Sequence, residues 1–284
     1  MGRHRAALGI LATAAAAALA GSCASAPRVP TPSGYALVWH DEFDRDGWPD
    51  PRNWTYERGF VRNQEAQWYQ ADNATVRDGM LVIEARRARV PNASYEAGST
   101  DWRRSRPAAE YTSASLTTRG LRAWRYGRFE MRGRIDVRSG MWPAFWTVGD
   151  GGRWPASGEI DIMEYYRQML LANVAWSDSS GRAVWDDSRK PLAELGGEAW
   201  ARRFHVWRMD WDADSIRLSV DDVLLNTTAL RGTEAGNPSR VDPLRQPHHV
   251  ILNLAIGGAN GGDPSATAFP ARFEVDWVRV YQRR

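Results

Sequence analysis

The feature that most restricts the fold of this chain is the placement of apolar residues at every second position in many short segments. In segment 128–137, Phe129, Met131, Ile135 and Val137 alternate with charged residues. A period of two is typical of β-strands whose two faces meet different surroundings. Alternation, or a short apolar run between turn residues, predicts further strands at Ala36–Phe43, Met80–Ala85, Tyr111–Thr117, Trp207–Trp211, Ile216–Val220, Val250–Leu254 and Phe273–Tyr281.

Helical periodicity is scarce, and Pro191–Trp200 is the clearest candidate for a short helix. Many strands without helices between them favour antiparallel sheets arranged as a sandwich or a barrel. No internal repeat and no second linker follows residue 34 in the sequence. We therefore expect one β-rich domain over residues 35–284.

The N-terminal residues have the layout of an export signal followed by a tether. A basic start precedes the apolar run Ala6–Ala20, which is short for a membrane span of ~20 residues, and then comes Cys23. The residues before Cys23 are similar to the lipobox of bacterial lipoproteins, although the leucine lies one place too far upstream. Cleavage at the alanines just beyond Cys23 would instead give a plainly secreted protein. We expect a signal peptide over 1–22, lipidation of Cys23 or simple secretion, and a proline-rich tether over 23–34.

Charge and cysteine content exclude several classes of function. The chain carries 37 Lys and Arg against 34 Asp and Glu, and the basic residues form no block, so nucleic acid is not an expected partner. The one cysteine excludes an internal disulfide, a Cys-based zinc site and an iron–sulfur cluster. The 15 tryptophans outnumber the 9 tyrosines and the 7 phenylalanines, which indicates that some indoles serve a binding surface.

Three carboxylates lie close together after Trp154. On a regular strand Glu159 and Asp161 would share one face, whereas Glu164 would point into the core, where an unpaired carboxylate is costly. One extra residue near Ile162–Met163, a β-bulge, would return Glu164 to the acidic face. Three acids on one face repel one another, so at least one pKa should rise, and one group can stay protonated while another is ionised.

The acidic pattern alone also fits a calcium site or a solvated acidic strip. Trp142, Trp146 and Trp154 precede Glu159 closely, and indoles stack well on the C–H faces of sugar rings, although each could also belong to the core. Retaining glycosidases use two carboxyl groups about 5–5.5 Å apart. Together the acids and the tryptophans favour a glycosidase.

The segment Gly158–Glu164 resembles the signature of glycoside hydrolase family 16 in its bulged-strand form, and the laminarinase-like branch is closest. Further segments are similar to family blocks in the same order: Trp39–Phe43, Asn63–Tyr69, Tyr111–Ala114, Tyr126–Glu130, Trp142–Trp146, Ile251–Gly258 and Val275–Tyr281. The resemblance implies an all-β fold, a β-jelly-roll sandwich of two curved antiparallel sheets with a concave active-site cleft. It also implies retaining endo-hydrolysis of β-linked glucans or galactans.

The resemblance further implies roles for single residues. Glu159 matches the nucleophile, Asp161 its electrostatic assistant and Glu164 the general acid/base. Laminarinases typically carry histidines shortly after the acidic motif; this chain has none there, and Asn173 or Trp176 would fill that space. The residues expected to bind substrate are Trp142, Trp146, Trp154, Asn63, Glu65, Asn173 and Trp176, with Asn63 and Glu65 at the cleft rim.

Many relatives hold a structural calcium ion on the convex side. The resemblance places its ligands at Glu42, Asp276 and the carbonyl of Gly79, an all-oxygen set that suits calcium. Ordinary surface carboxylates explain the same residues equally well. The chemistry itself is expected to need no cofactor.

Two other motifs are not expected to carry function. Gly257–Gly262 lacks the Lys-Ser/Thr that would follow a phosphate-binding loop, so we expect a turn between strands. His248 and His249 lack the spacing of a helical zinc site.

The sequence therefore predicts an exported, monomeric endo-glycosidase that cleaves β-1,3- or mixed β-1,3/1,4-glucan by double displacement. Three alternatives share the fold: a galactan hydrolase of the agarase or carrageenase kind, a transglycosylase, and a non-catalytic carbohydrate-binding protein. The three clustered acids argue against the last of these, because a lectin has no use for them.

Overall fold

A computed structural model describes residues 1–2, 29–233 and 242–284 of the chain. The chain divides into two units, Met1–Thr31 and Pro32–Arg284, and every described strand and helix lies in the second. Cys23, the expected lipidation site, lies outside the described residues. No helix among the described residues combines the length and the apolar character needed to cross a membrane.

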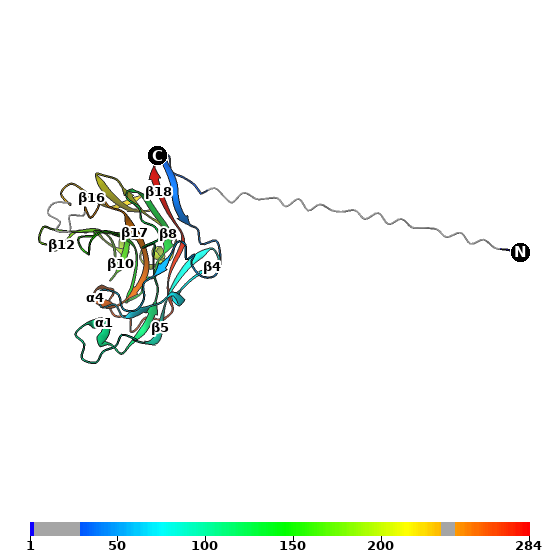
Figure 1. Cartoon of the computed structure of the whole chain (residues 1–284), viewed down its shortest axis with the longest axis horizontal. Helices are drawn as coiled ribbons and strands as arrows, with labels where there is room; N and C mark the ends of the chain where they lie inside the picture. The colour runs from blue at the N-terminus through cyan, green and yellow to red at the C-terminus, as the bar shows by residue number, and fades with distance from the viewer. Residues whose placement is uncertain (3–28, 234–241) are drawn as a thin grey trace. The chain divides into compact units, whose positions relative to one another are not determined.

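Two curved β-sheets form the second unit (Figure 1). In the described residues the larger sheet has ten strands, and eight of them form a continuous path. Their order is β16 (Val223–Ala229), β15 (Ser215–Val220), β14 (His205–Trp211), β8 (Gly127–Arg134), β18 (Ala271–Arg283), β5 (Met80–Pro91), β6 (Ala108–Ser113) and β3 (Gln67–Tyr69), with β1 (Tyr35–Asp41) beside β18 and β4 (Ala74–Arg77) beside β5.

The smaller sheet contains the acidic segment in β10, a strand that has a neighbouring strand on each side. Its eight described strands run in the order β12 (Ala183–Asp186), β11 (Met169–Ser177), β10 (Glu159–Tyr166), β9 (Met141–Gly149), β17 (His248–Ile256), β7 (Ser115–Thr117) and β2 (Thr55–Tyr56), with β13 (Arg189–Pro191) beside β11. Neighbouring strands are antiparallel except β3 and β6, which are parallel. The described helices are short: η1 (Ala71–Asn73), α1 (Trp102–Ser105), α2 (Leu192–Leu195), α3 (Gly197–Ala201) and α4 (Gly258–Gly261).

Each strand predicted from the alternation is present, although two of them end or divide differently, and some strands, such as β11 and β16, were not predicted. The strand predicted over 111–117 is divided at Ala114, because β6 and β7 belong to different sheets. The strand predicted over 128–137 ends at Arg134. The predicted helix at 191–200 is present as α2 and α3, which meet at Gly196, where a φ of 110° favours glycine. The glycine-rich turn after β17 contains the short helix α4.

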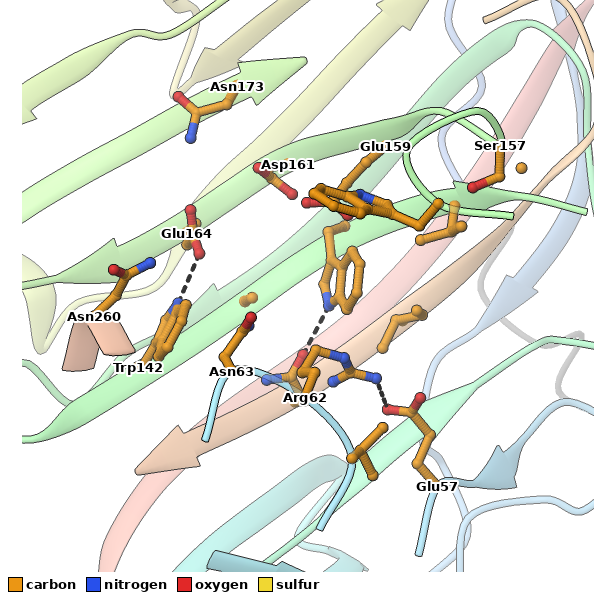
Figure 2. Close-up of a pocket in the computed structure, with 18 of the residues that line it drawn as sticks. Glu57, Arg62, Asn63, Trp142, Ser157, Glu159, Asp161, Glu164, Asn173 and Asn260 are labelled. Atoms are coloured by element: carbon orange, nitrogen blue, oxygen red, sulfur yellow. Dashed lines mark hydrogen bonds and ion pairs between the residues drawn. The ribbon is translucent and has the colours of Figure 1, made fainter. Parts of the chain in front are cut away.

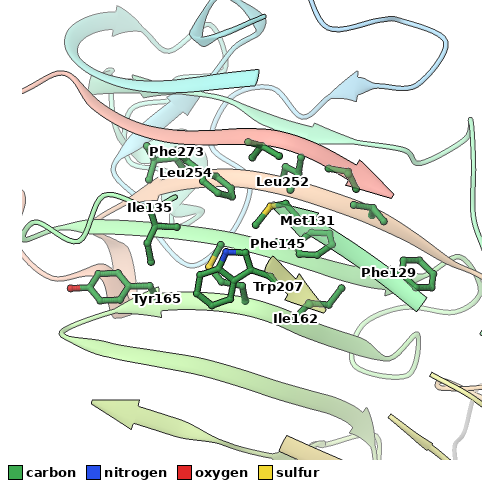
Figure 3. Close-up of a cluster of buried hydrophobic side chains, with 14 of the residues drawn as sticks. Phe129, Met131, Ile135, Phe145, Ile162, Tyr165, Trp207, Leu252, Leu254 and Phe273 are labelled. Atoms are coloured by element: carbon green, nitrogen blue, oxygen red, sulfur yellow. The ribbon is translucent and has the colours of Figure 1, made fainter. Parts of the chain in front are cut away.

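The hydrophobic core lies between the two sheets (Figure 3). Phe129 and Trp207 of the larger sheet pack in one cluster with Phe145, Ile162 and Leu252 of the smaller sheet. Burying a large apolar side chain contributes about 1.5–3 kcal/mol, so this layer holds the sheets together. Alternate residues of β9, β10 and β17 point away from the core into a cleft, and the fold is the expected β-jelly-roll sandwich.

The two side chains expected to hold calcium are paired with arginines. Arg279 binds both carboxylate oxygens of Glu42, at 2.9 and 2.7 Å, and Arg132 binds Asp276. Gly79, the third expected ligand, lies in the turn between β4 and β5. Across the described residues no cluster of three His, Cys, Asp or Glu side chains is fit for a metal ion. Each carboxylate is thus engaged by a guanidinium, which competes with a calcium ion for the same oxygens.

Candidate active site

A bulge in β10 brings the three carboxylates onto one face. Glu159 and Asp161 pair regularly with β11, and the register then shifts before Glu164. Against β9 the shift lies between Asp161 and Met163. Ile162 and Met163 both point into the core, so the extra residue returns Glu164 to the cleft. The predicted bulge is confirmed at the predicted place, and Figure 2 shows the three acids in a row along the strand.

The acids line the floor of a cleft of about 890 Å³. Its walls come from the face of β9, β10, β11 and β17 that points away from the core, and from the loops at 57–65 and 149–158. The volume lies at the upper end of the usual range for ligand sites, which suits a segment of a polymer.

Burial dominates the electrostatics of Glu159 and Asp161. It raises the pKa of Glu159 to about 7, while the positive charge of Arg62 and hydrogen bonds from Trp154 and Asp161 act in the opposite direction. The pKa of Asp161 is raised well above its ordinary value by burial and by the negative charges of Glu159 and Glu164. A protonated Asp161 can therefore donate its hydrogen bond to an ionised Glu159.

Glu164 has the properties of a proton donor near neutral pH. Burial raises its pKa to about 7, and the charge of Glu159 adds to the rise. The indole N–H of Trp142 donates to Glu164 Oε1 at 2.6 Å, which stabilises the carboxylate and limits the rise (Figure 2). A group that is half protonated near pH 7 can both give and take a proton there.

The variant Trp142→Phe is expected to move the alkaline limb of the pH profile of kcat/KM upward by about 1–2 pH units. Removing a hydrogen bond to a charged group costs about 1.5–3 kcal/mol, and one pKa unit equals 1.36 kcal/mol. The loss destabilises the carboxylate, so Glu164 keeps its proton to higher pH. Trp54→Phe is the matched control, because Trp54 donates to Asp41 at 2.9 Å outside the cleft. An alkaline limb that stays in place would contradict the assignment.

The three tryptophans expected at the substrate all line the cleft. Trp142 is bound to Glu164, and the Trp146 indole donates to Asn253 Oδ1 at 2.7 Å. Both rings are held by these bonds with little exposure, whereas Trp154 is 53% exposed. The structure thus provides two fixed indoles on the floor and one open indole at the rim.

The remaining expected substrate-binding residues take different places. Asn63 is exposed at the cleft, whereas Glu65 is buried and accepts from Gln67 at 2.6 Å. Asn173 lines the cleft and hydrogen-bonds Asp161. Trp176 does not line the cleft: it lies on the other face of β11 and packs against the core. Residues three apart on a regular strand point to opposite faces, so only Asn173 can fill the space near the acids.

Arg62 is a cleft residue that no motif in the sequence indicates. Its guanidinium binds Glu57 and lies 5.0 Å from the centre of the Trp146 ring, and Ser115 donates to Glu57 at 2.6 Å. The positive charge of Arg62 lowers the pKa of Glu159 and so counteracts the rise that burial causes. Adjacency to Asn63 was the only signal for it in the sequence. Other cleft residues without a sequence signal are His249, which contacts Asp150 at 2.6 Å, Asn253, Asn260, Tyr166 and Trp185.

Comparison with known proteins agrees with this site. The model of the glycosyl hydrolases family 16 matches residues 62–279. A β-glucanase from Rhodothermus marinus is 39% identical over 269 residues, covering 87% of this chain and 85% of the relative. The solved laminarinase from the same organism is 37% identical with a TM-score of 0.70, covering 88% and 98% of the two chains.

A second similar structure comes from work on endo-acting O-glycanases with which prominent members of the human gut microbiota initiate mucin breakdown. It is 33% identical with a TM-score of 0.82, covering 91% of this chain and 94% of that one. The family match includes the bulged strand and most of the residues that line the cleft. The chain belongs to glycoside hydrolase family 16 and is a hydrolase of O-glycosidic bonds.

Proposed function

We propose that this protein is an endo-acting β-glucan hydrolase that cleaves β-1,3- or mixed β-1,3/1,4-linked glucan with retention of configuration. The observation that carries the proposal is the bulged strand that sets Glu159, Asp161 and Glu164 on the floor of one cleft. The similarity to a β-glucanase and a laminarinase supports glucan as the substrate.

The reaction proceeds in two displacements. Glu164 gives its proton to the glycosidic oxygen while a carboxylate oxygen of Glu159 attacks the anomeric carbon, so the C–O bond breaks and a glycosyl ester forms. Glu164, now ionised, then takes a proton from water, whose oxygen attacks the same carbon and releases Glu159. Asp161 donates a hydrogen bond to Glu159 and stabilises its negative charge when the ester breaks.

A panel of polysaccharides tests the substrate and the activity together. We expect reducing sugar to be released from laminarin and from mixed-linkage glucan, with oligosaccharides of intermediate size as early products. Proton NMR should show the β-anomer first. Cleavage of a galactan such as agarose or carrageenan, or of keratan sulfate, with no cleavage of glucan, would overturn the substrate assignment. Products longer than the substrate would indicate a transglycosylase, and no cleavage of any glycan a binding protein.

We also propose that the protein is exported and acts as a monomer, anchored in the bacterial cell envelope by a lipid on Cys23. The support is the basic start, the apolar run 6–20 and the lipobox-like residues before Cys23. A single acyl chain binds membranes only marginally, so anchoring requires the multiple acylation of a bacterial lipoprotein.

The variant Cys23→Ser is expected to shift the protein from the membrane fraction to the soluble fraction. Without the thiol no thioether to a lipid can form, so the protein has no covalent anchor in the bilayer. Immunoblots of fractionated cells measure the distribution, with Ser22→Ala as the control that keeps the cysteine. An equal distribution of wild type and Cys23→Ser would favour ordinary signal cleavage and secretion.

A further inference from the structure

Two exposed indoles stand at the end of the cleft nearest β12. Trp154 is 53% exposed and Trp185 is 40% exposed, and both line the cleft. Their ring centres lie 6.4 Å apart and their planes are inclined by 50°. Among the described residues the other exposed tryptophan is Trp48, which is 60% exposed and lies outside the cleft. Large apolar rings left open to water inside a ligand cleft indicate a contact that forms on binding.

The strand register fixes where Trp185 stands relative to the nucleophile. Trp185 pairs with Ala175 across β12 and β11, and Ala175 pairs with Glu159 across β11 and β10. Directly paired residues project to the same face, and neighbouring strands lie about 4.8 Å apart. Trp185 is therefore on the cleft face two strands from Glu159, at a backbone distance of about 10 Å. The small side chain of Ala175 between them leaves the space above it to the two indoles.

Trp154 connects this position to the reacting centre. It lies in the loop between β9 and β10 and donates a hydrogen bond to Glu159. The two inclined indole rings therefore form a corner in the cleft. Trp154 is the ring next to the nucleophile, and Trp185 is the ring farther from it. Asp187 and Arg189 also line the cleft and pair with each other at 3.3 Å. They lie level with Glu164, because Arg189 pairs with Leu171 and Leu171 pairs with Glu164.

We propose that Trp154 and Trp185 form a subsite for a pyranose ring of the polysaccharide beyond the ring that reacts, and that Trp185 makes catalytic efficiency depend on chain length. The inference rests on the proposed function, since it takes a glycan as the occupant of the cleft. The C–H face of a pyranose covers an indole and removes its apolar surface from water. Trp185 touches neither the reacting carbon nor the acids, so its contribution is to binding.

Kinetics on oligosaccharides of increasing length test the subsite. Trp185→Ala is expected to raise KM about 3- to 10-fold for laminarin and for long β-1,3-oligosaccharides, because the contact between the indole and the sugar ring is lost. The shortest cleaved oligosaccharide, which does not reach β12, should keep its kcat/KM. Trp185→Phe should recover part of the loss, and Trp48→Ala should behave as wild type. A purely structural role of Trp185 would lower kcat/KM equally at every length.

Binding without turnover separates this inference from the proposed function. In the full-length Glu159→Gln protein, laminarin and keratan sulfate in native gels retard migration if they bind, and the added Trp185→Ala change should weaken the retardation about 3- to 10-fold. If only keratan sulfate is bound and Trp185→Ala weakens that binding, the subsite stands and the glucan assignment fails. If Trp185→Ala and Trp48→Ala give equal retardation and equal KM at every length, the subsite proposal is wrong.

Discussion

Replacing Glu159 by alanine is expected to lower turnover by about 10⁴- to 10⁶-fold, the range found when a member of a covalent-catalysis unit is removed. The anomeric carbon then has no nucleophile, while Trp142, Trp146 and Asn63 remain to hold the sugar. Initial rates on laminarin measure the loss, and migration in glucan gels measures the binding that should persist.

Azide makes this test specific for the role of Glu159. The small anion fits the space left by the carboxylate, attacks the anomeric carbon from the same side, and leaves an α-glycosyl azide that the enzyme cannot hydrolyse. Glu65→Gln is the matched control, because Glu65 is also a buried carboxyl at the cleft and should give no azide product. A Glu159→Ala variant with the wild-type rate, or no azide product from it on an activated glycoside, would contradict the nucleophile assignment.

The bulge could be predicted from the sequence because it settles an energetic conflict between neighbouring residues. Ile160 and Ile162 are apolar and Glu164 is charged, and a regular strand would bury all three together. Which residues of one strand share a face follows from their spacing alone, so it can be predicted without the rest of the fold. The same rule places Trp142 and Trp146, four residues apart, on one face of β9.

The Trp176 prediction was wrong because no strand had been assigned to its segment. Once β11 is known to run over Met169–Ser177, a separation of three residues puts Asn173 and Trp176 on opposite faces. A resemblance in sequence located the gap left by the missing histidines. The resemblance could not show whether Asn173 or Trp176 points into that space.

The pairings that the sequence did not reveal join distant segments. Arg279 meets Glu42 just beyond the end of β1, and Arg132 meets Asp276 across β8 and β18. Both carboxylates expected to bind calcium are engaged in these contacts. Arg62 approaches Trp146 because the loop before β3 forms one wall of the cleft. Such contacts depend on the register between strands, which follows from the whole fold and not from any short pattern.

Replacing Glu164 by alanine should impair the two displacements unequally. With natural glucan, whose leaving group needs a proton, kcat/KM is expected to fall about 10²- to 10⁴-fold. With a 2,4-dinitrophenyl β-glycoside the leaving group needs no proton, so Glu159 still forms the glycosyl ester at a near-normal rate. Water then lacks its general base, and the ester should accumulate, which appears as a burst of dinitrophenol followed by slow turnover.

Azide distinguishes the roles of the two acids because it reacts with the glycosyl ester in the Glu164 variant and with the substrate itself in the Glu159 variant. In Glu164→Ala the anion attacks the glycosyl ester from the side opposite Glu159, needs no base, and should restore turnover with a β-glycosyl azide as product. In Glu159→Ala it replaces the nucleophile itself and yields the α-anomer. The two variants therefore predict opposite anomers from one reagent, measured by proton NMR of the isolated azides. If the anomers are exchanged, Glu164 is the nucleophile and Glu159 the acid/base; if neither variant yields an azide, the bulged strand does not carry a double displacement.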